Sequence, residues 1–95
     1  MWTSIDHHVS MDGAAVSPDL LLSGEACYGD ALVIPGIGIR IVNDTTNKRL
    51  KNTVDIFVDT KEQEHRIGVR HLKVSVLKSE KRACSRKVFM SMKKP

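Results

Sequence analysis

Short apolar runs with a period of two, separated by turn residues, constrain the fold of this chain more than any other feature. Apolar residues occupy alternate positions from Ile37 to Ile41, and similar runs cover residues 54–58 and 72–76. The dipeptide Pro35-Gly36, which suits the centre of a type II turn, precedes the first run. Such alternation is typical of β-strands that bury one face. No strand–helix–strand repeat is visible, so the sequence predicts a mainly β fold.

The other expected elements are also short. Residues 14–17 and 31–34 are expected to form strands, and Pro18 favours a helical turn over residues 19–22. A capping-box motif predicts a short helix over residues 61–67. About five strands and one short helix favour a small β-barrel, an architecture that removes exposed strand edges. The 95 residues suffice for one such domain with a small core.

The charge distribution divides the chain into a nearly neutral body and a basic C-terminal segment. Residues 1–79 carry nine Lys or Arg and ten Asp or Glu, whereas residues 80–95 carry six Lys or Arg and one Glu. We therefore expect a barrel domain over 1–79 and a basic tail over 80–95. The tail either contacts an anionic wall polymer, a membrane surface or nucleic acid, or is a solvated terminus.

Composition argues against several classes of protein. One Trp, one Tyr and two Phe are too few for an aromatic platform that stacks bases, and the body is nearly neutral, so a nucleic-acid-binding barrel is disfavoured. No stretch approaches the ~20 apolar residues of a membrane span. The first residues show no signal peptide. Cys27 and Cys84 form one bridge or remain two free thiols, and this choice stays open.

Two carboxylates are the leading candidates for catalysis. Asp44 and Asp55 are eleven residues apart, and Asp55 interrupts the apolar run of residues 54–58. Desolvation raises the pKa of an unpaired carboxyl group, and an acid that holds its proton near neutral pH can act as a general acid. Asp55 is therefore the first candidate. A second carboxylate at Asp44 would raise the pKa of Asp55 further, whereas cations of the intervening loop would lower it.

Each candidate also has a structural interpretation. Asp44, at a strand end, commonly caps the next turn, and Asp55 could pair with a cation of the loop. Lys48 and Lys51 belong to a basic loop that could simply be solvated. The adjacent His7 and His8 lie in an N-terminus expected to be loose, which rarely supplies the three or four ligands of a zinc site. We therefore expect no metal and no cofactor.

Several segments taken together resemble a known family, the three-aspartate (3D) domain. The resemblance covers residues 14–78, and its most specific parts are the Asp44-Thr45 dipeptide, the eleven-residue step to Asp55, and a closing Gly-x-Arg-x-x-x-Val motif. The segments are Ala15-Val16-Ser17-Pro18, Tyr28-Gly29-Asp30-Ala31-Leu32-Val33-Ile34, Ile41-Val42-Asn43-Asp44-Thr45, Val54-Asp55-Ile56-Phe57, Gly68-Val69-Arg70 and Val74-Ser75-Val76-Leu77. The resemblance implies a small double-psi β-barrel with one short helix. The family includes stationary-phase survival and resuscitation-type muralytic proteins and membrane-bound lytic transglycosylase A.

The resemblance implies that the partner is the glycan strand of peptidoglycan. The bond between N-acetylmuramic acid and N-acetylglucosamine is cut without water, which leaves a 1,6-anhydro-muramyl end. Asp55 matches the catalytic acid and then base, and Asp44 matches its companion. The residues expected to bind substrate are Thr45, Lys48, Lys51, Ser17 and Asp19. The cell envelope, periplasmic or extracellular, is the expected location.

This chain departs from the family pattern at several positions. Ser17 stands where the family usually has an aspartate, Thr46-Asn47 replaces a glycine pair, and the N-terminal part of the barrel looks shortened. These departures favour the alternative that the protein is a non-catalytic glycan-binding module. They also leave open a homodimer, in which a shortened barrel borrows a strand from a second copy.

Overall fold

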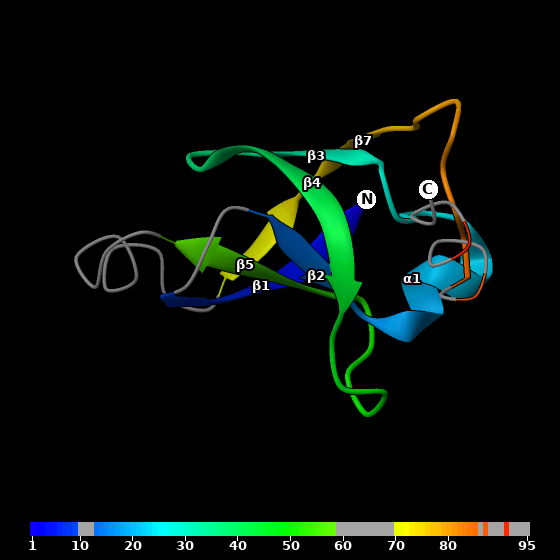
Figure 1. The fold of residues 1–95 in the computed structure, drawn as a ribbon. Coiled ribbons are helices and arrows are strands. Elements are labelled where there is room, and N and C mark those ends of the chain that lie inside the picture. Colours follow the sequence, from blue (N-terminus) through cyan, green and yellow to red (C-terminus); the bar gives the residue numbers. More distant parts are fainter. Residues whose placement is uncertain (10–12, 59–69, 86, 88–90, 92–95) are drawn as a thin grey trace.

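The chain forms a mainly β structure whose sheet closes almost completely into a barrel, with one short helix (Figure 1). The computed structural model describes residues 1–9, 13–58, 70–85, 87 and 91. Its elements are β1 (Trp2–Val9), β2 (Ala14–Val16), α1 (Pro18–Ser23), β3 (Ala31–Ile34), β4 (Gly38–Thr45), β5 (Thr53–Val58), β6 (Arg70–Lys73) and β7 (Ser75–Leu77). The predicted fold class is confirmed.

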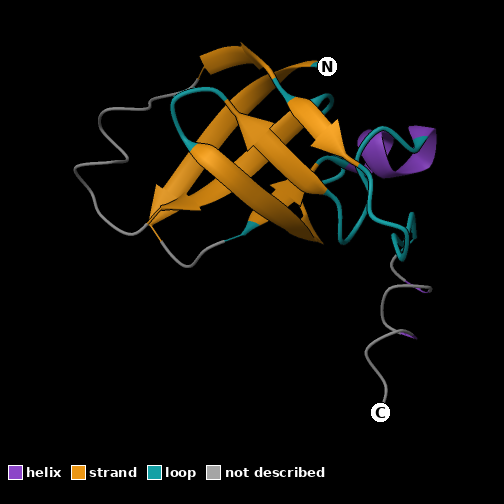
Figure 2. Cartoon of the chain, turned by 90° about the horizontal axis from the view of Figure 1, so that it is seen from above, coloured by secondary structure: helices purple, strands orange, loops and turns teal. Residues whose placement is uncertain are grey.

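The strand order explains how the barrel closes. The strands lie in the order β6-β1-β5-β2-β4-β3-β7, so the two end strands are consecutive in the chain and are separated only by Val74. Val74 is completely buried, and its backbone N–H donates to the carbonyl of Met1 at 2.6 Å. One continuous segment therefore spans the gap between the sheet ends (Figure 2). The pairs β1/β5 and β2/β4 are parallel, and the other pairings are antiparallel.

The expectation of a loose N-terminus is wrong for Trp2–Val9. These residues form β1, which pairs in parallel with β5 and antiparallel with β6. The side chains of Thr3 and Ile5 are completely buried, while Trp2 and Ser4 face outward. The strand escaped notice because the inward positions include a threonine, which weakens the apolar alternation. With β1 in place, one chain supplies all seven strands of the nearly closed barrel.

The core follows the alternation that the sequence predicts. In β3, Leu32 and Ile34 are buried and Ala31 and Val33 are half-buried, which is the period of two expected of a strand with one face inward. The inward side chains of the other strands join the same cluster, including Ile5, Val16, Val42, Val54 and Ile56. This cluster fixes which residues of each strand face solvent.

The helix α1 closes one end of the barrel. Pro18 occupies its first turn, where a missing N–H costs nothing, and Gly24 ends it in the left-handed conformation with φ of 78°. Leu20 and Leu21 are buried against the core. Within the part of the chain that the structure describes, no helix is long and apolar enough to cross a membrane.

Most of the predicted elements are observed. The strand at residues 31–34 is found as predicted, and Ile37 N–H donates to Ile34 C=O at 3.0 Å across the Pro35-Gly36 turn. The last predicted strand divides at Val74 into β6 and β7. The helix predicted over residues 61–67 lies outside the described residues.

The folded body extends to Cys84, past the boundary expected at residue 80. Tyr28 and Ala83 exchange two backbone hydrogen bonds of 2.9 and 3.0 Å. Cys27 and Cys84 form a disulfide across 57 residues, which decides between the two alternatives for these cysteines. The first basic residues of the segment therefore belong to the body of the protein.

Candidate functional site

The strand register places Asp55 and Asp44 in one row across the barrel wall. Asp55 on β5 lies opposite Ala15 on β2, and Ala15 lies opposite Asp44 on β4. Neighbouring strands are about 4.8 Å apart, so the Cα atoms of the two aspartates are separated by about 10 Å. The row continues to β1, where Asp6 is the register partner of Asp55. Sequence reasoning did not place Asp6 in this row, because β1 was not predicted.

A β-bulge decides which face Asp44 occupies. Ala14 pairs with Val42, but the next residue, Ala15, pairs with Asp44, so one residue of β4 is extra. Regular alternation would turn Asp44 to the same side as Val42, which is buried in the core. The extra residue moves Asp44 to the other face.

Asp55 shares the face that the bulge gives to Asp44. Its neighbours Val54 and Ile56 are completely buried, so alternation along β5 turns Asp55 outward. The side chain of Asp55 is half-buried, whereas that of Asp44 is exposed. The two carboxylates therefore lie on one outer face, and Asp55 is the more shielded of the two.

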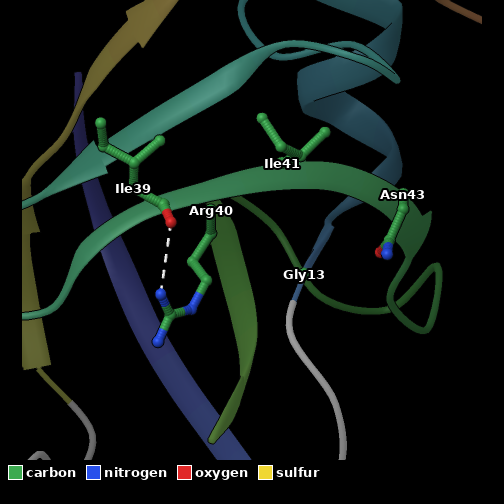
Figure 3. A pocket seen from close by; sticks show the side chains of 5 residues that line it. All are labelled: Gly13, Ile39, Arg40, Ile41 and Asn43. Carbon is green, nitrogen blue, oxygen red and sulfur yellow. Dashed lines mark hydrogen bonds between the residues drawn. The ribbon is translucent and has the colours of Figure 1, made fainter.

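The extra residue of the bulge, Asn43, packs against Gly13. A Cβ atom at Gly13 would overlap the side-chain amide of Asn43, and Gly13 has φ of 136°, a conformation that L residues rarely adopt. Both residues line a hollow of about 260 Å³ together with Ile39, Arg40 and Ile41 (Figure 3). Glycine at position 13 thus permits the close approach that accompanies the bulge.

The carboxylate of Asp44 makes a local hydrogen bond within β4 rather than to a later residue of the loop. Its Oδ1 accepts a hydrogen bond from the backbone N–H of Thr45 at 2.8 Å. Thr45 is half-buried at the end of β4, and Lys48 is exposed in the loop that leads to β5. Thr45 and Lys48 are thus close to Asp44 in the sequence, at the end of β4 and in the loop that follows it.

The other predicted substrate-binding residues lie around the start of β5. Ser17 is completely buried, and its hydroxyl accepts a hydrogen bond from Thr53 N–H at 2.9 Å. Asp19 accepts one from Asn52 N–H at 3.0 Å through Oδ2, and Lys51 is exposed beside this pair. The structure leaves Ser17 no exposed surface for a ligand, so the expectation that it contacts substrate is corrected to a role in joining β2 to β5.

Asp19 is held in its charged form. Burial raises the pKa of its carboxyl group, but the Ser17 hydroxyl, the backbone N–H of Asn52 and the charge of Lys51 together bring the pKa below its ordinary value of 3.8. Asp19 is therefore a carboxylate at neutral pH, and Lys51 offsets its charge.

A second hollow adjoins Asp19, and sequence reasoning missed it. It is an open groove of about 450 Å³ lined by Met1, Trp2, Asp19, Leu20, Ser23, Glu25 and Asn52. Trp2 is 61% exposed, which is high for the largest aromatic side chain. The sequence carried no clear signal for this groove, because Trp2 lies on β1, which the sequence did not predict.

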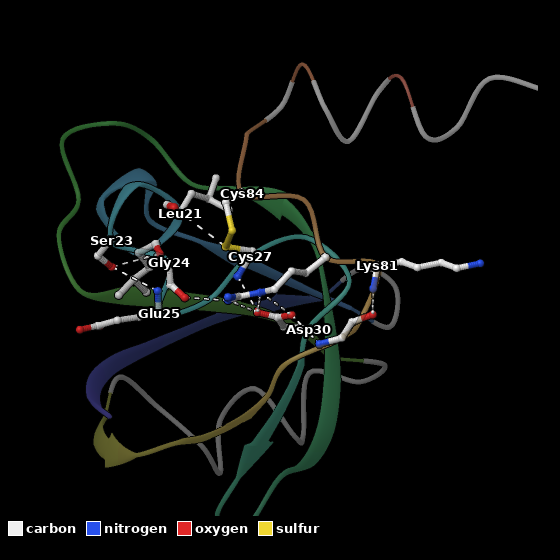
Figure 4. A network of polar contacts seen from close by, with 11 residues as sticks. Leu21, Ser23, Gly24, Glu25, Cys27, Asp30, Lys81 and Cys84 are labelled. Atoms are coloured by element: carbon white, nitrogen blue, oxygen red, sulfur yellow. Dashed lines mark hydrogen bonds and ion pairs between the residues drawn. A yellow bond between two sulfur atoms is a disulfide. The ribbon is translucent and has the colours of Figure 1, made fainter.

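A third carboxylate, Asp30, has a different environment and was not singled out. It is completely buried and accepts backbone N–H bonds from Cys27 and Ser79, both of 2.9 Å. Arg82 adds an ion pair at 2.6 Å and also donates to Gly24 C=O (Figure 4). Burial raises the pKa of Asp30, but these donors and the Arg82 charge hold it below its ordinary value. Asp30 thus anchors the C-terminal segment.

Comparisons with protein-family models, with curated proteins and with solved structures found no match. Among the residues that the structure describes, no group of three or more His, Cys, Asp or Glu side chains could hold a metal ion. The geometry of the carboxylates is therefore the basis for a functional proposal.

Proposed function

We propose that this barrel acts on the glycan strand of peptidoglycan as a lytic transglycosylase. The observation that carries the proposal is the shared outer face of Asp44 and Asp55, which exists only because of the bulge in β4. Bulges are common beside active sites, where they redirect a side chain. The resemblance to the three-aspartate domain supplies the class of substrate.

Asp55 is assigned the acid and base roles. The protonated carboxyl group gives its proton to the glycosidic oxygen as the bond to C1 of the muramyl residue breaks. The resulting carboxylate then accepts the proton of the muramyl 6-hydroxyl as O6 bonds to C1, which forms the 1,6-anhydro ring. No water is consumed, and Asp55 ends in its starting protonation state.

Asp44 is assigned an electrostatic role. The transition state resembles an oxocarbenium ion, and a carboxylate on the same face would stabilise its positive charge. Lys48, exposed in the following loop, is suited to the anionic lactyl-peptide part of the glycan. Thr45 holds Asp44 in place through its backbone N–H.

Location in the cell envelope forms part of the proposal. The Cys27–Cys84 disulfide supports it, because disulfides persist in oxidising compartments such as the periplasm and the extracellular space.

The proposal is tested by mass spectrometry of the products released from purified sacculi. Wild-type protein is expected to release anhydro-muropeptides, and Asp55→Asn, shown to be folded by circular dichroism, is expected to release at least about 10²-fold less. Glu80→Gln, which changes an exposed carboxylate near the C-terminus, is the matched control and should behave as wild type. Equal release by Asp55→Asn and wild type would exclude Asp55 as the acid.

A second candidate is a non-catalytic glycan-binding module. It is favoured by the finding that neither of the two hollows described above is lined by Asp44 or Asp55. This candidate predicts that the protein sediments with sacculi but yields no anhydro product under any condition. Product release that depends on Asp55 would rule it out.

A further inference from the structure

The groove beside α1 has features of a ligand site that the carboxylate row does not explain. Trp2 is the only tryptophan of the chain, it is 61% exposed, and it lines the groove. The large apolar face of Trp2 borders a groove that polar groups also line, and this combination is suited to contact with a ligand.

The backbone that carries Trp2 is fixed rather than free. The side-chain amide of Asn52 donates to the Trp2 carbonyl at 2.7 Å, and the Asn52 backbone N–H donates to Asp19 at 3.0 Å. Asn52 itself adopts φ of 47°, a left-handed conformation that non-glycine residues seldom adopt. Ser4 N–H also donates to the Asn52 carbonyl at 3.0 Å. Asn52 therefore joins β1 to the start of α1 and fixes the backbone that carries the aromatic ring.

Polar groups face the same groove from the C-terminal end of α1. The Ser23 hydroxyl donates to Leu20 C=O at 3.2 Å and accepts from Glu25 N–H at 3.3 Å, and the Glu25 carboxylate is exposed. Lys51 already offsets the charge of Asp19. An aromatic face with nearby hydrogen-bonding groups suits a neutral pyranose ring, whose C–H face stacks on the indole while its hydroxyls bind the carboxylate.

The groove lies on the same outer surface as the carboxylate row. Ser4 pairs with Thr53, Trp2 lies two residues before Ser4, and Asp55 lies two residues after Thr53. Four residues along a strand and one strand across give a separation of roughly 14 Å between the Cα atoms of Trp2 and Asp55. More than one sugar ring is needed to span that distance.

We infer that the groove is an accessory subsite for an N-acetylated sugar ring, with Trp2 as the stacking platform and Asn52 as its positioning residue. The inference rests on the proposed function in one respect, namely that the ligand is part of a glycan strand that continues towards Asp55. It adds a substrate requirement, because a strand that reaches both sites must contain several sugar rings.

Because Trp2 is the only tryptophan, its fluorescence reports on the groove directly. Titration with N-acetylglucosamine tetramer is expected to give a saturable change of Trp2 emission. Calorimetric titration of Trp2→Ala is expected to show at least about tenfold weaker binding. Leu22→Ala, which removes an 87% exposed apolar side chain of α1 outside the groove, is the matched control and should bind as wild type.

A second variant tests the positioning role of Asn52. Glycine accepts a positive φ without strain, so Asn52→Gly removes the amide that holds Trp2 but keeps the backbone conformation. We expect about fivefold weaker tetramer binding, with an unchanged circular dichroism spectrum. Wild-type affinity in folded Asn52→Gly would overturn the positioning role.

The experiment separates this inference from the catalytic proposal. Asp55→Asn should show the wild-type emission change, although it releases much less product. An emission change without cleavage by wild type would support the groove and overturn catalysis. Cleavage without an emission change would support catalysis and overturn the groove. Binding of the deacetylated glucosamine tetramer but not of the N-acetylated one would also overturn the inference, because it would indicate a cation–π site for an amine.

Discussion

Two carboxylates of this barrel, Asp30 and Asp55, show how differently one small fold treats the same chemical group. Asp30 is completely buried where the C-terminal segment meets the body, and it is paired with Arg82 and two backbone donors. Asp55 is half-buried in the middle of the wall and faces outward. The first is held in one charged state, as a structural anchor requires. The second keeps access to solvent and ligands, as a group that exchanges protons requires.

On the proposed function, the region of Asp30 contributes stability and the region of Asp55 contributes chemistry. Breaking a buried ion pair by removing one partner costs about 3–5 kcal/mol, because the other charge remains buried and uncompensated.

Reduction of the Cys27–Cys84 disulfide should have the largest effect on stability. The bond closes a loop of 57 residues, and the chain-entropy model gives it a contribution of about 4 kcal/mol. The urea midpoint of unfolding should therefore fall strongly in dithiothreitol. The double variant Cys27→Ala/Cys84→Ala should show the same low midpoint with and without reductant. An unchanged midpoint for reduced wild type would show that the C-terminal anchor does not depend on the bridge.

The variant Asp30→Asn should rank next. It leaves Arg82 without its acidic partner, and we expect a loss of about 3 kcal/mol in the free energy of unfolding, measured by urea denaturation. Arg82→Lys keeps the charge but loses the planar fork, so its loss should be smaller. A loss in Asp30→Asn below that of Arg82→Lys would contradict the assignment of Asp30 as the centre of the anchor.

The variant Gly13→Ala should cost about 1–3 kcal/mol and should also disturb the bulge. Its Cβ overlaps the Asn43 amide, and its φ of 136° disfavours any L residue. Because the bulge turns Asp44 outward, product release per folded molecule should fall as well. Asn43→Ala removes the overlap but leaves the unfavourable φ of residue 13. The double variant Gly13→Ala/Asn43→Ala should therefore recover only part of the stability. Full activity in folded Gly13→Ala would separate the bulge from function.

Acid should weaken the anchor that Asp30 forms with the C-terminal segment. The folded pKa of Asp30 lies below its ordinary value of 3.8, so its contribution to stability is present above that value and is lost as the pH falls through the folded pKa. Asp19 acts in the same direction. The melting temperature should decline below about pH 4, and the decline should be shallower in Asp30→Asn. Equal slopes for wild type and Asp30→Asn would exclude Asp30 as a source of the acid sensitivity.

Local patterns predicted part of this fold, and long-range pairings decided the rest. The strand at residues 31–34 and the turn at Pro35-Gly36 follow from alternation and turn chemistry, which act over a few residues. β1 was missed because its inward position Thr3 is polar, and its burial depends on β5 and β6.

The candidate site could also be predicted only in part, because its geometry depends on long-range pairings. The sequence singled out Asp44 and Asp55, but their common face depends on a register shift between β2 and β4 that no single strand encodes. The role of Ser17 depends on its bond to Thr53, which lies 36 residues away. The backbone position of Trp2 depends on a hydrogen bond from Asn52, which lies 50 residues away in the sequence.

The most direct test measures anhydro-muropeptide release per folded molecule for wild type, Asp55→Asn and Asp30→Asn, under conditions in which all three are folded. We predict near-wild-type release by Asp30→Asn. We predict that release by Asp55→Asn falls by about 10²- to 10⁴-fold, the usual contribution of a general acid or base. Wild-type release by Asp55→Asn, or an equal loss in folded Asp30→Asn, would contradict the division between an anchoring and a reacting carboxylate.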